Sequence, residues 1–421
     1  MDLKFTAEQE KWRKEVSDFL DEEVRNAPPG YFIDDIMSDV HESEEHWKWT
    51  RELTERVGAK GWISMGWPTK FAKWGGRDAR PMEMAIFGEE MARHETTLAY
   101  GVTTLGPPVL THGSEELQEE FLPRIAAGKL TCMLGLSESD AGSDMANVKT
   151  KAIKQPDGDY LINGHKIFSS MGHRADYCLL LAVTDPSARK RYGFSRFALN
   201  MKSPGITISA WWNMSGKGHH QNQVFFDDVR IPARNLIGVE NQGWGEMNRD
   251  RGGGGGVAGA NARGYFNDFV QFCKETKRNG QPLIKDPIVR NKLAELGIEL
   301  EVMYQLGWAA VTEREKAHGR PIEGVGGGLH QVSGSLTTLM RKEWMPRFAM
   351  AAMQIVGPLS QIRGNPVLHL REGAKWAPVV GDNPGWIERY YRGHAFDNHR
   401  HGTPEVLRMI IATRGLGLPR L

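Results

Sequence analysis

The order of the predicted elements indicates an α+β protein built from three regions. Apolar residues recur at helical spacing between charged ones in residues 1–128 and again in residues 241–421. Between them, residues 129–240 hold short β-prone runs separated by turn residues. A chain of 421 residues is also too long for one small domain. We therefore predict an N-terminal helical domain, a middle β domain and a C-terminal helical domain with these boundaries.

Each region contains recognisable elements. Helical patterns cover residues 5–20, 80–94, 114–126, 258–276, 288–316, 329–355 and 403–414. Strand patterns cover residues 159–162, 177–183, 194–201, 206–212 and 223–226. The first of these strands follows a Pro-Asp-Gly turn. A helix–sheet–helix order is uncommon, and it narrows the field of candidate folds.

Composition argues against several classes of protein. Lys and Arg total 53 against 52 for Asp and Glu, so there is no basic excess of the kind that nucleic-acid binding proteins carry. Residues 1–23 are charged throughout and do not resemble a signal peptide, and no run reaches the ~18 apolar residues of a membrane span. The three cysteines, Cys132, Cys178 and Cys273, are far apart and form no CxxC pair. This usage predicts no disulfide framework and favours a reducing cytoplasm.

Four segments, in order along the chain, carry a resemblance to a known family. Residues 132–144 read Cys-Met-Leu-Gly-Leu-Ser-Glu-Ser-Asp-Ala-Gly-Ser-Asp, and residues 163–172 read Asn-Gly-His-Lys-Ile-Phe-Ser-Ser-Met-Gly. Residues 224–232 read Val-Phe-Phe-Asp-Asp-Val-Arg-Ile-Pro and are followed by Asn-Leu-Ile-Gly at 235–238. Residues 405–420 form a helix pattern and a Gly-Leu-Gly-Leu-Pro-Arg tail. Together they resemble the acyl-CoA dehydrogenases, flavoproteins whose middle domain is a β-barrel and whose C-terminal domain is a four-helix bundle.

The resemblance implies FAD as the cofactor and names its contacts. In the first segment the family's Pro-Gly is replaced by Ser139-Asp140, positions that shape the turn more than they contact cofactor. In the second, Phe168 takes the place of an aromatic that packs on the flavin, although it could equally be strand core. Arg278 is the natural cation for a diphosphate reached from a neighbouring subunit, or else a solvated helix end. The full set of implied FAD contacts is Leu134, Leu136, Ser137, Gly142, Ser143, Phe168, Ser170, Arg278, Gln354, Gly357, Gly402 and Thr403.

The resemblance also implies the reaction, in which a carboxylate takes the α-proton of an acyl-CoA and the β-hydride passes to flavin N5. Most members place a glutamate directly before the Gly-Thr of the last helix, where this chain has His401. A second branch places it before an arginine on the first helix of the C-terminal domain, and that position is Asp250. Asp250 is therefore the candidate base, with His401 second because imidazole titrates near neutrality. Arg251 and Ser143 are the implied contacts of the CoA moiety.

Two features remain open. The run Gly252–Gly256 stands at a helix start, where each glycine costs roughly 0.5–1 kcal/mol relative to alanine. It would leave room for a large acyl group or keep the helix mobile until a ligand or partner arrives, or it is a loop without a role. His394, His399 and His401 lie close in sequence, but further ligands are not evident, so no metal site is predicted.

Three functions follow from the resemblance. The leading one is an α,β-dehydrogenase like the bacterial members that act on steroid side chains or other bulky acyl-CoAs, with an electron-transferring flavoprotein as acceptor. Such an enzyme would be a homo-oligomer, a dimer or a tetramer. The second is a base-deficient or half-competent subunit that pairs with another family member. The third is a flavin oxidase or monooxygenase of the same fold.

Overall fold

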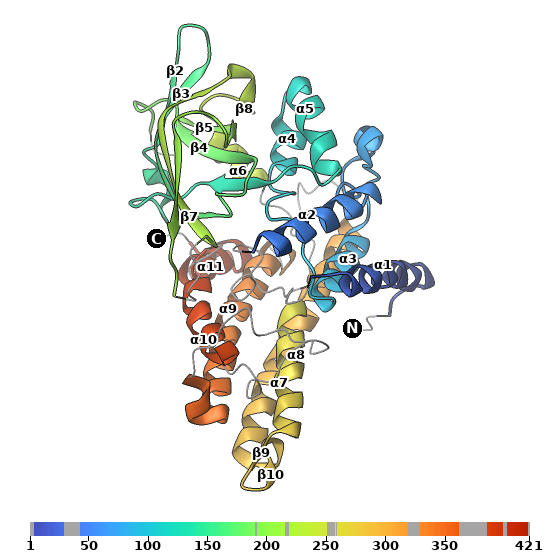
Figure 1. Ribbon diagram of the computed structural model, residues 1–421. Helices are drawn as coiled ribbons and strands as arrows, with labels where there is room; N and C mark the ends of the chain where they lie inside the picture. Colours follow the sequence, from blue (N-terminus) through green and yellow to red (C-terminus); the bar gives the residue numbers. More distant parts are fainter. Residues whose placement is uncertain are drawn as a thin grey trace. The chain divides into compact units, whose positions relative to one another are not determined.

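The computed structural model describes residues 4–28, 43–189, 192–214, 219–250, 257, 259–318, 329–361, 385–398 and 402–419. The chain divides into two compact units, each discontinuous in sequence. The sheet unit comprises residues 40–79 and 97–254, and the helical unit comprises residues 1–39, 80–96 and 255–421. Figure 1 colours both units along the sequence.

The sheet unit is built on a mixed eight-stranded sheet with the order β6-β7-β3-β2-β4-β5-β8. Strand β1 pairs in parallel with β4, outside this path. The strands are β1 (Cys132–Gly135), β2 (Lys151–Lys154), β3 (Tyr160–Ser170), β4 (Tyr177–Val183), β5 (Phe194–Asn200), β6 (Ile206–Trp211), β7 (Gln221–Ile231) and β8 (Leu236–Ile237). Every predicted strand is present.

Turn chemistry and alternating burial explain this sheet. Strands β2 and β3 are joined at Gly158, which adopts a left-handed φ of 95° and donates its N–H to Gln155 O at 2.9 Å. Inward-facing side chains of β3, β4, β5 and β7 then form one apolar core. Its centre includes Tyr160 packed edge-to-face on Phe197, with ring centroids 4.8 Å apart.

The sheet unit also contains seven helical segments among its described residues. They are α2 (Glu44–Ala59), α4 (Gly106–His112), α5 (Glu115–Ala126), α6 (Gly243–Asp250) and the 3-10 helices η1 (Thr69–Trp74), η2 (Met145–Asn147) and η3 (Ala233–Asn235). Ser114 caps α5 by accepting from Leu117 N, and the apolar side of α5 packs on the sheet. There Phe121 meets Tyr177 edge-to-face at 4.9 Å. The glutamates of α5 lie on its solvent-accessible side.

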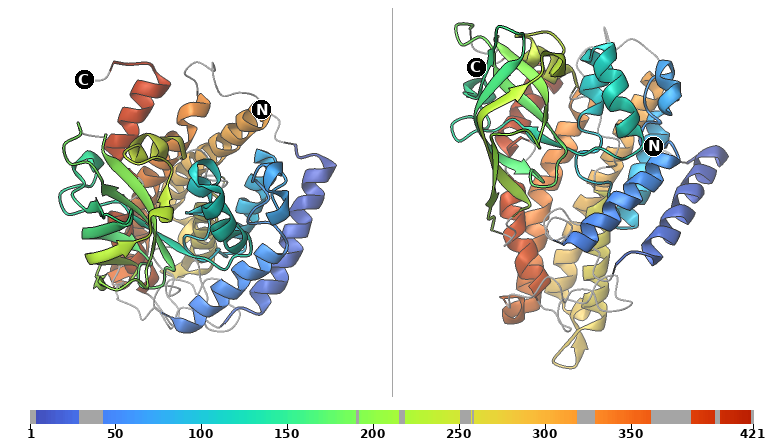
Figure 2. Two further views of the ribbon diagram at one scale, coloured as in Figure 1. Left: turned by 90° about the horizontal axis from the view of Figure 1, so that it is seen from above. Right: turned by 45° about the horizontal axis from the view of Figure 1, so that its top comes forward.

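The helical unit consists of α1 (Ala7–Arg25), α3 (Pro81–Arg93), α7 (Ala260–Glu275), α8 (Pro287–Ala317), α9 (Leu329–Val356), α10 (Gly385–Asp397) and α11 (Pro404–Ile410). A hairpin of β9 (Lys277–Arg278) and β10 (Gln281–Pro282) joins α7 to α8 (Figure 1). Helix α9 packs against α8, α10 and α11, and Figure 2 shows these helices side by side. Their core is aromatic, with Trp344 stacked on Phe348 at 5.0 Å. Trp344 also donates its indole N–H to Leu296 O at 2.9 Å.

The observed elements confirm the predicted α+β fold class. All seven predicted helical segments are present, although α2, α4, α6 and α10 were not predicted individually. The two compact units do not follow the three predicted domains, because α1 and α3 belong with the C-terminal helices. Among the described residues, no helix is long and apolar enough to cross a membrane.

Candidate functional site

The segment after β1 is a short, tightly built loop. Cys132, Met133 and Gly135 are buried, whereas Leu134 projects with 36% of its surface exposed. Glu138 and Ala141 then exchange two backbone hydrogen bonds of 3.0 and 3.1 Å around the turn Ser139-Asp140. Ser139 and Asp140, which stand where the family has Pro-Gly, therefore form the turn itself, and both are exposed.

The predicted contacts on either side of that turn are accessible. Leu136 and Ser137 are half-buried, and Gly142 and Ser143 are exposed. A Cβ atom added at Gly142 would meet no atom within 4 Å. The absence of a side chain at Gly142 therefore leaves open space in which a ligand can contact the backbone directly.

A buried ion pair fixes the loop to the sheet. Lys166 on β3 is fully buried, and its Nζ lies 2.8 Å from Glu138 Oε1 and 3.1 Å from Leu136 O. Glu138 also accepts from Lys149 N at 2.6 Å and Thr150 N at 3.0 Å. Burial raises the pKa of Glu138, but the Lys166 charge and these donors outweigh it and lower that pKa below its ordinary value. Both residues lie within the segments that carry the family resemblance, but the sequence alone does not indicate that they meet.

A β-bulge presents Phe168 to the outside. Lys166 pairs with Val224 and Ser169 with Asn222, so β3 uses one residue more than β7 at this point. Phe168 adopts a φ of 54°, which is rare for an aromatic residue, and it is 45% exposed. Its ring lies 5.1 Å from that of Trp211. The alternative that Phe168 is strand core is therefore wrong.

Polar groups beside Phe168 are left without protein partners. The Ser169 hydroxyl and the Gln221 side-chain oxygen are buried, and neither has a hydrogen-bond partner among the described residues. Gln221 pairs across the sheet with the half-buried Ser170. An exposed aromatic face next to unpaired polar groups fits a planar heteroaromatic ring with a polar edge, as in a flavin. Trp211 and Gln221 were missed from the sequence, because neither lies in a matched segment.

The second set of predicted contacts lies in the helical unit. Arg278 and Gln354 line one cavity of about 600 Å³, together with Ile355 and the first turns of α8. Arg278 lies in β9, where its guanidinium donates to Ile355 O, so it is not a free helix end. Gly357 follows α9 with a φ of 75°, and an added Cβ would meet nothing within 4 Å. The cavity thus contains a cation held by a backbone carbonyl, which suits a diphosphate, and Gly357 lies outside its lining.

Gly402 and Thr403 begin the last helix. Gly402 adopts a φ of 87°, and Thr403 is the N-cap of α11, accepting from Val406 N at 3.4 Å. The hydroxyl proton of Thr403 is not used by this bond, because the oxygen acts only as acceptor. Thr403 could therefore donate to a ligand.

The two candidates for the base differ in how far they are described. Asp250 is the last residue of α6, and only its backbone is described. His401, Arg251 and Gly252–Gly256 lie outside the described residues. Helix α6 itself is held by Glu246, which is buried, binds Arg196 at 3.2 Å and accepts from Val239 N at 3.0 Å.

We expect Gly238→Ala to weaken the interactions of Glu246 that hold α6 in place. Gly238 has a φ of 79°, and a Cβ there would lie 2.2 Å from the Glu246 carboxylate. The left-handed backbone alone costs an alanine about 1–2 kcal/mol, and displacing Glu246 adds to that loss. Urea unfolding monitored by fluorescence should show the lower stability. Gly245→Ala is the matched control, since nothing lies within 4 Å of its Cβ position on the same helix. Equal stability of the two variants would contradict this account of the anchor.

The predicted FAD contacts thus fall into two groups, one in each unit. The sheet unit holds Leu134, Leu136, Ser137, Gly142, Ser143, Phe168 and Ser170, and the helical unit holds Arg278, Gln354, Gly357, Gly402 and Thr403. Within the helical unit, Arg278 and Gln354 share a cavity.

Comparison with known proteins agrees with the resemblance found in the sequence. Models of the acyl-CoA dehydrogenase N-terminal, middle and C-terminal domains match residues 6–129, 133–229 and 238–416. Acyl-CoA dehydrogenase FadE29 of Mycobacterium tuberculosis is 29% identical over 403 residues, which cover 93% of this chain and 95% of that protein.

Two solved structures are similar over their full length and that of this chain. They are the ChsE4-ChsE5 complex from Mycobacterium tuberculosis, with a TM-score of 0.79, and the Tcur3481-Tcur3483 steroid ACAD, with a TM-score of 0.77. Both are 26% identical to this chain and covered completely. The three domain models, in order along nearly the whole sequence, show that the chain belongs to the acyl-CoA dehydrogenase family and is an FAD-dependent oxidoreductase.

Proposed function

We propose that this enzyme dehydrogenates an acyl-CoA thioester to the trans-2-enoyl-CoA, with Asp250 as the base that takes the α-proton. The observation that best supports a flavin site is the platform formed by exposed Phe168 beside the unpaired Ser169 and Gln221. FAD, when bound, supplies the acceptor for the β-hydride at N5. The residues that would hold it are the two groups described above.

The remaining steps, binding of the CoA moiety and removal of the α-proton, are assigned to side chains of this protein. Ser143 is exposed beside the open backbone of Gly142 and is the proposed contact of the CoA moiety, together with Arg251. The base must lie within hydrogen-bond reach of the α-carbon proton. Asp250 ends the helix α6, which is anchored by the buried, ion-paired Glu246, so the backbone from which the proposed base extends is held in place. His401 is the alternative acceptor.

Anaerobic reduction of the bound flavin tests this proposal. The protein is purified alone, its FAD content is measured, and acyl-CoAs of increasing bulk are added while flavin absorbance is followed. Bleaching by at least one acyl-CoA is expected. FAD-loaded protein that no acyl-CoA bleaches would overturn the proposal of a self-sufficient dehydrogenase. Rapid reoxidation of the reduced flavin by O₂ would instead favour an oxidase.

Phe168→Ala should weaken FAD binding by about tenfold. Burying an aromatic ring against a ligand contributes roughly 1.5–3 kcal/mol of binding free energy. The flavin keeps part of this contribution through its contacts with the residues that remain, so the net loss is smaller. The dissociation constant of FAD from the apoprotein, followed by flavin fluorescence, provides the measurement. Phe225→Ala is the matched control, because Phe225 is 40% exposed on the same sheet and stacks on His165. If both variants bind FAD as the wild type does, Phe168 is no flavin contact.

A paired subunit is the second candidate. Two observations favour it. His401 stands where most members of the family place the base, and both similar structures named above carry two protein names, one of them being described as a complex. In this reading, the chain joins a related subunit that supplies the missing base. Two results would support it. The isolated chain would bind less than one FAD per chain, and acyl-CoA would reduce the flavin only after a second family member is added. A homo-oligomer, an electron-transferring flavoprotein as acceptor and a cytoplasmic location remain predictions.

The similar structures also bear on the substrate. One of them is described as a steroid ACAD. We infer a bulky acyl group, such as a steroid side chain, in place of a short linear one. The acyl-CoA series above decides this, because the rate of flavin reduction should rise with acyl bulk.

A further inference from the structure

The sequence contains two Asn-Gly pairs, Asn163-Gly164 and Asn279-Gly280, and such a pair can react with itself. The deprotonated backbone nitrogen of the glycine attacks the asparagine Cγ and expels ammonia, which leaves a five-membered succinimide. Water then opens the succinimide to aspartate or isoaspartate. Glycine favours this reaction because it has no side chain to obstruct the attack. The carboxamide must also be free to rotate, so the surroundings of each pair decide whether it reacts.

The first pair is held within the sheet. Asn163 is half-buried in β3, where its Nδ2 donates to Asp228 Oδ1 at 2.8 Å and its Oδ1 accepts from Asp228 N at 3.0 Å. Gly164 is closely packed, since an added Cβ would lie 2.4 Å from the Thr150 hydroxyl oxygen. The carboxamide of Asn163 is therefore fixed at both ends, which opposes formation of the succinimide.

The second pair forms the two-residue turn between β9 and β10, a hairpin that projects from the ends of α7 and α8 (Figure 1). Asn279 and Gly280 are both exposed, with φ of 53° and 81°. The Asn279 carboxamide has no hydrogen-bond partner among the described residues. An added Cβ at Gly280 would meet no atom within 4 Å. The side chain of Asn279 can therefore rotate onto the following nitrogen, unlike that of Asn163.

The residue before Asn279 is the cation proposed for the FAD diphosphate. Arg278 lines the cavity of about 600 Å³, and its guanidinium donates to Ile355 O. It forms no ion pair with a carboxylate of the described residues. Its positive charge therefore remains available to a phosphate.

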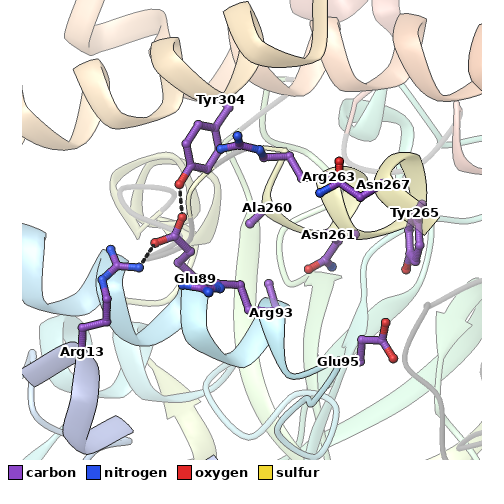
Figure 3. A pocket seen from close by; sticks show the side chains of 12 residues that line it. Arg13, Glu89, Arg93, Glu95, Ala260, Asn261, Arg263, Tyr265, Asn267 and Tyr304 are labelled. Carbon is purple, nitrogen blue, oxygen red and sulfur yellow. Dashed lines mark hydrogen bonds and ion pairs between the residues drawn. The ribbon is translucent and has the colours of Figure 1, made fainter. Parts of the chain in front are cut away.

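Another cavity of the helical unit shows what carboxylates do to an arginine. Arg13 lies 2.7 Å from Glu89 and 2.9 Å from Glu90, and Figure 3 shows its pair with Glu89. Arg263, in the same lining, lies 3.1 Å from Glu301. These guanidinium charges are already neutralised by their partners. A carboxylate created beside Arg278 would act in the same sense.

We propose that Asn279 is a deamidation site and that its conversion to aspartate or isoaspartate weakens the binding of FAD. The new carboxylate repels the diphosphate and competes with it for Arg278. Isoaspartate also lengthens the main chain of the turn by one methylene, which displaces Arg278 from its pairing with Gln281. The modification does not depend on the proposed function, whereas its effect on the cofactor rests on the proposed FAD contact of Arg278.

Peptide mass spectrometry of the purified full chain tests the modification. After incubation at pH 8, we expect acid at position 279 to form about tenfold faster than at position 163. The rate at position 279 should fall at pH 6, because the attacking nitrogen must lose its proton. Asn279→Gly is the matched control, since glycine also adopts the left-handed angles of this turn but cannot deamidate. Equal rates at the two asparagines, or an amide at position 279 that survives in the folded chain but not in the urea-unfolded one, would overturn the site.

The dissociation constant of FAD from the apoprotein tests the effect on the cofactor. Asn279→Asp supplies the charge without lengthening the main chain, and aspartate tolerates a positive φ. This variant should bind FAD about threefold more weakly or worse, and the difference should shrink at about 1 M salt. Asn279→Gly should bind FAD within about twofold of the wild type.

Asn267→Asp controls for net charge, because Asn267 is equally exposed but lines the other cavity. It should leave the affinity for FAD unchanged. Wild-type affinity in Asn279→Asp, or an equal loss in Asn267→Asp, would overturn the effect on the cofactor. Neither result bears on dehydrogenation, which fails separately if no acyl-CoA reduces the flavin of the unmodified protein.

Discussion

Asp250→Asn is expected to slow anaerobic flavin reduction by acyl-CoA by about 10²–10⁴-fold. Asparagine has nearly the same shape as aspartate but cannot accept the α-proton, so the loss reports basicity and not packing. The effect should lie in the reduction step itself, with little change in the concentration of acyl-CoA that half-saturates it. Rapid-mixing absorbance of the flavin gives both quantities.

Two companion variants make this result specific. Asp250→Glu should retain substantial activity, because the carboxylate returns one methylene further along. His401→Gln should reduce the flavin within about tenfold of the wild-type rate. The opposite pattern, with Asp250→Asn active and His401→Gln inactive, would assign the base to His401. If both variants reduce the flavin normally, the base comes from elsewhere and the paired-subunit reading gains support.

Local sequence patterns predict most of the fold because they record which faces are buried. Strands β4, β5 and β6 were placed to within one residue, since continuous apolar runs or alternation end there at turn residues. Helix α2 was not placed, although Ser43 caps it and Glu44 and Glu45 occupy its first turn. Those are the ordinary signals of a helix start, so this helix could have been predicted from the sequence.

The site was less predictable, because its features depend on pairing across the chain. The sequence cannot say that Phe168 lies in a bulge, since the bulge appears only when β3 and β7 are set in register. In the same way, Glu138 and Lys166 are far apart in sequence and meet only because β3 passes beneath the loop. Gln221 enters the site through the same strand pairing, and Trp211 enters it through the pairing of β6 with β7.

The pair Glu138–Lys166 also explains how a polar loop can be held rigidly at a ligand site. A loop that presents Gly142 and Ser143 outward has few apolar contacts of its own. The ion pair and two backbone donors to Glu138 take the place of those contacts. Rigidity at such a loop lowers the ordering cost of binding a cofactor.

Lys166→Met should therefore destabilise the protein by about 3–5 kcal/mol. Methionine fills a similar volume but leaves Glu138 buried without its counter-charge, and that uncompensated carboxylate carries the cost. Urea unfolding at pH 7 measures the change in the free energy of unfolding. Lys149→Met is the matched control, since Lys149 forms an exposed pair with Asp140 at 2.7 Å on the same loop and its loss should leave the unfolding midpoint almost unchanged. Equal effects of the two variants would show that the buried pair does not stabilise the loop.

The same pair gives the stability of the wild type a pH dependence of known sign. Because the pKa of Glu138 is lowered in the folded state, its contribution is present above the unfolded pKa of about 4.3 and is lost as pH falls through the lower folded value. Adding Glu138→Gln to Lys166→Met removes the stranded charge, so the double variant should recover part of the lost stability and lose this component of the acid dependence. A double variant that is less stable than Lys166→Met alone would show that packing, and not the unpaired charge, causes the loss.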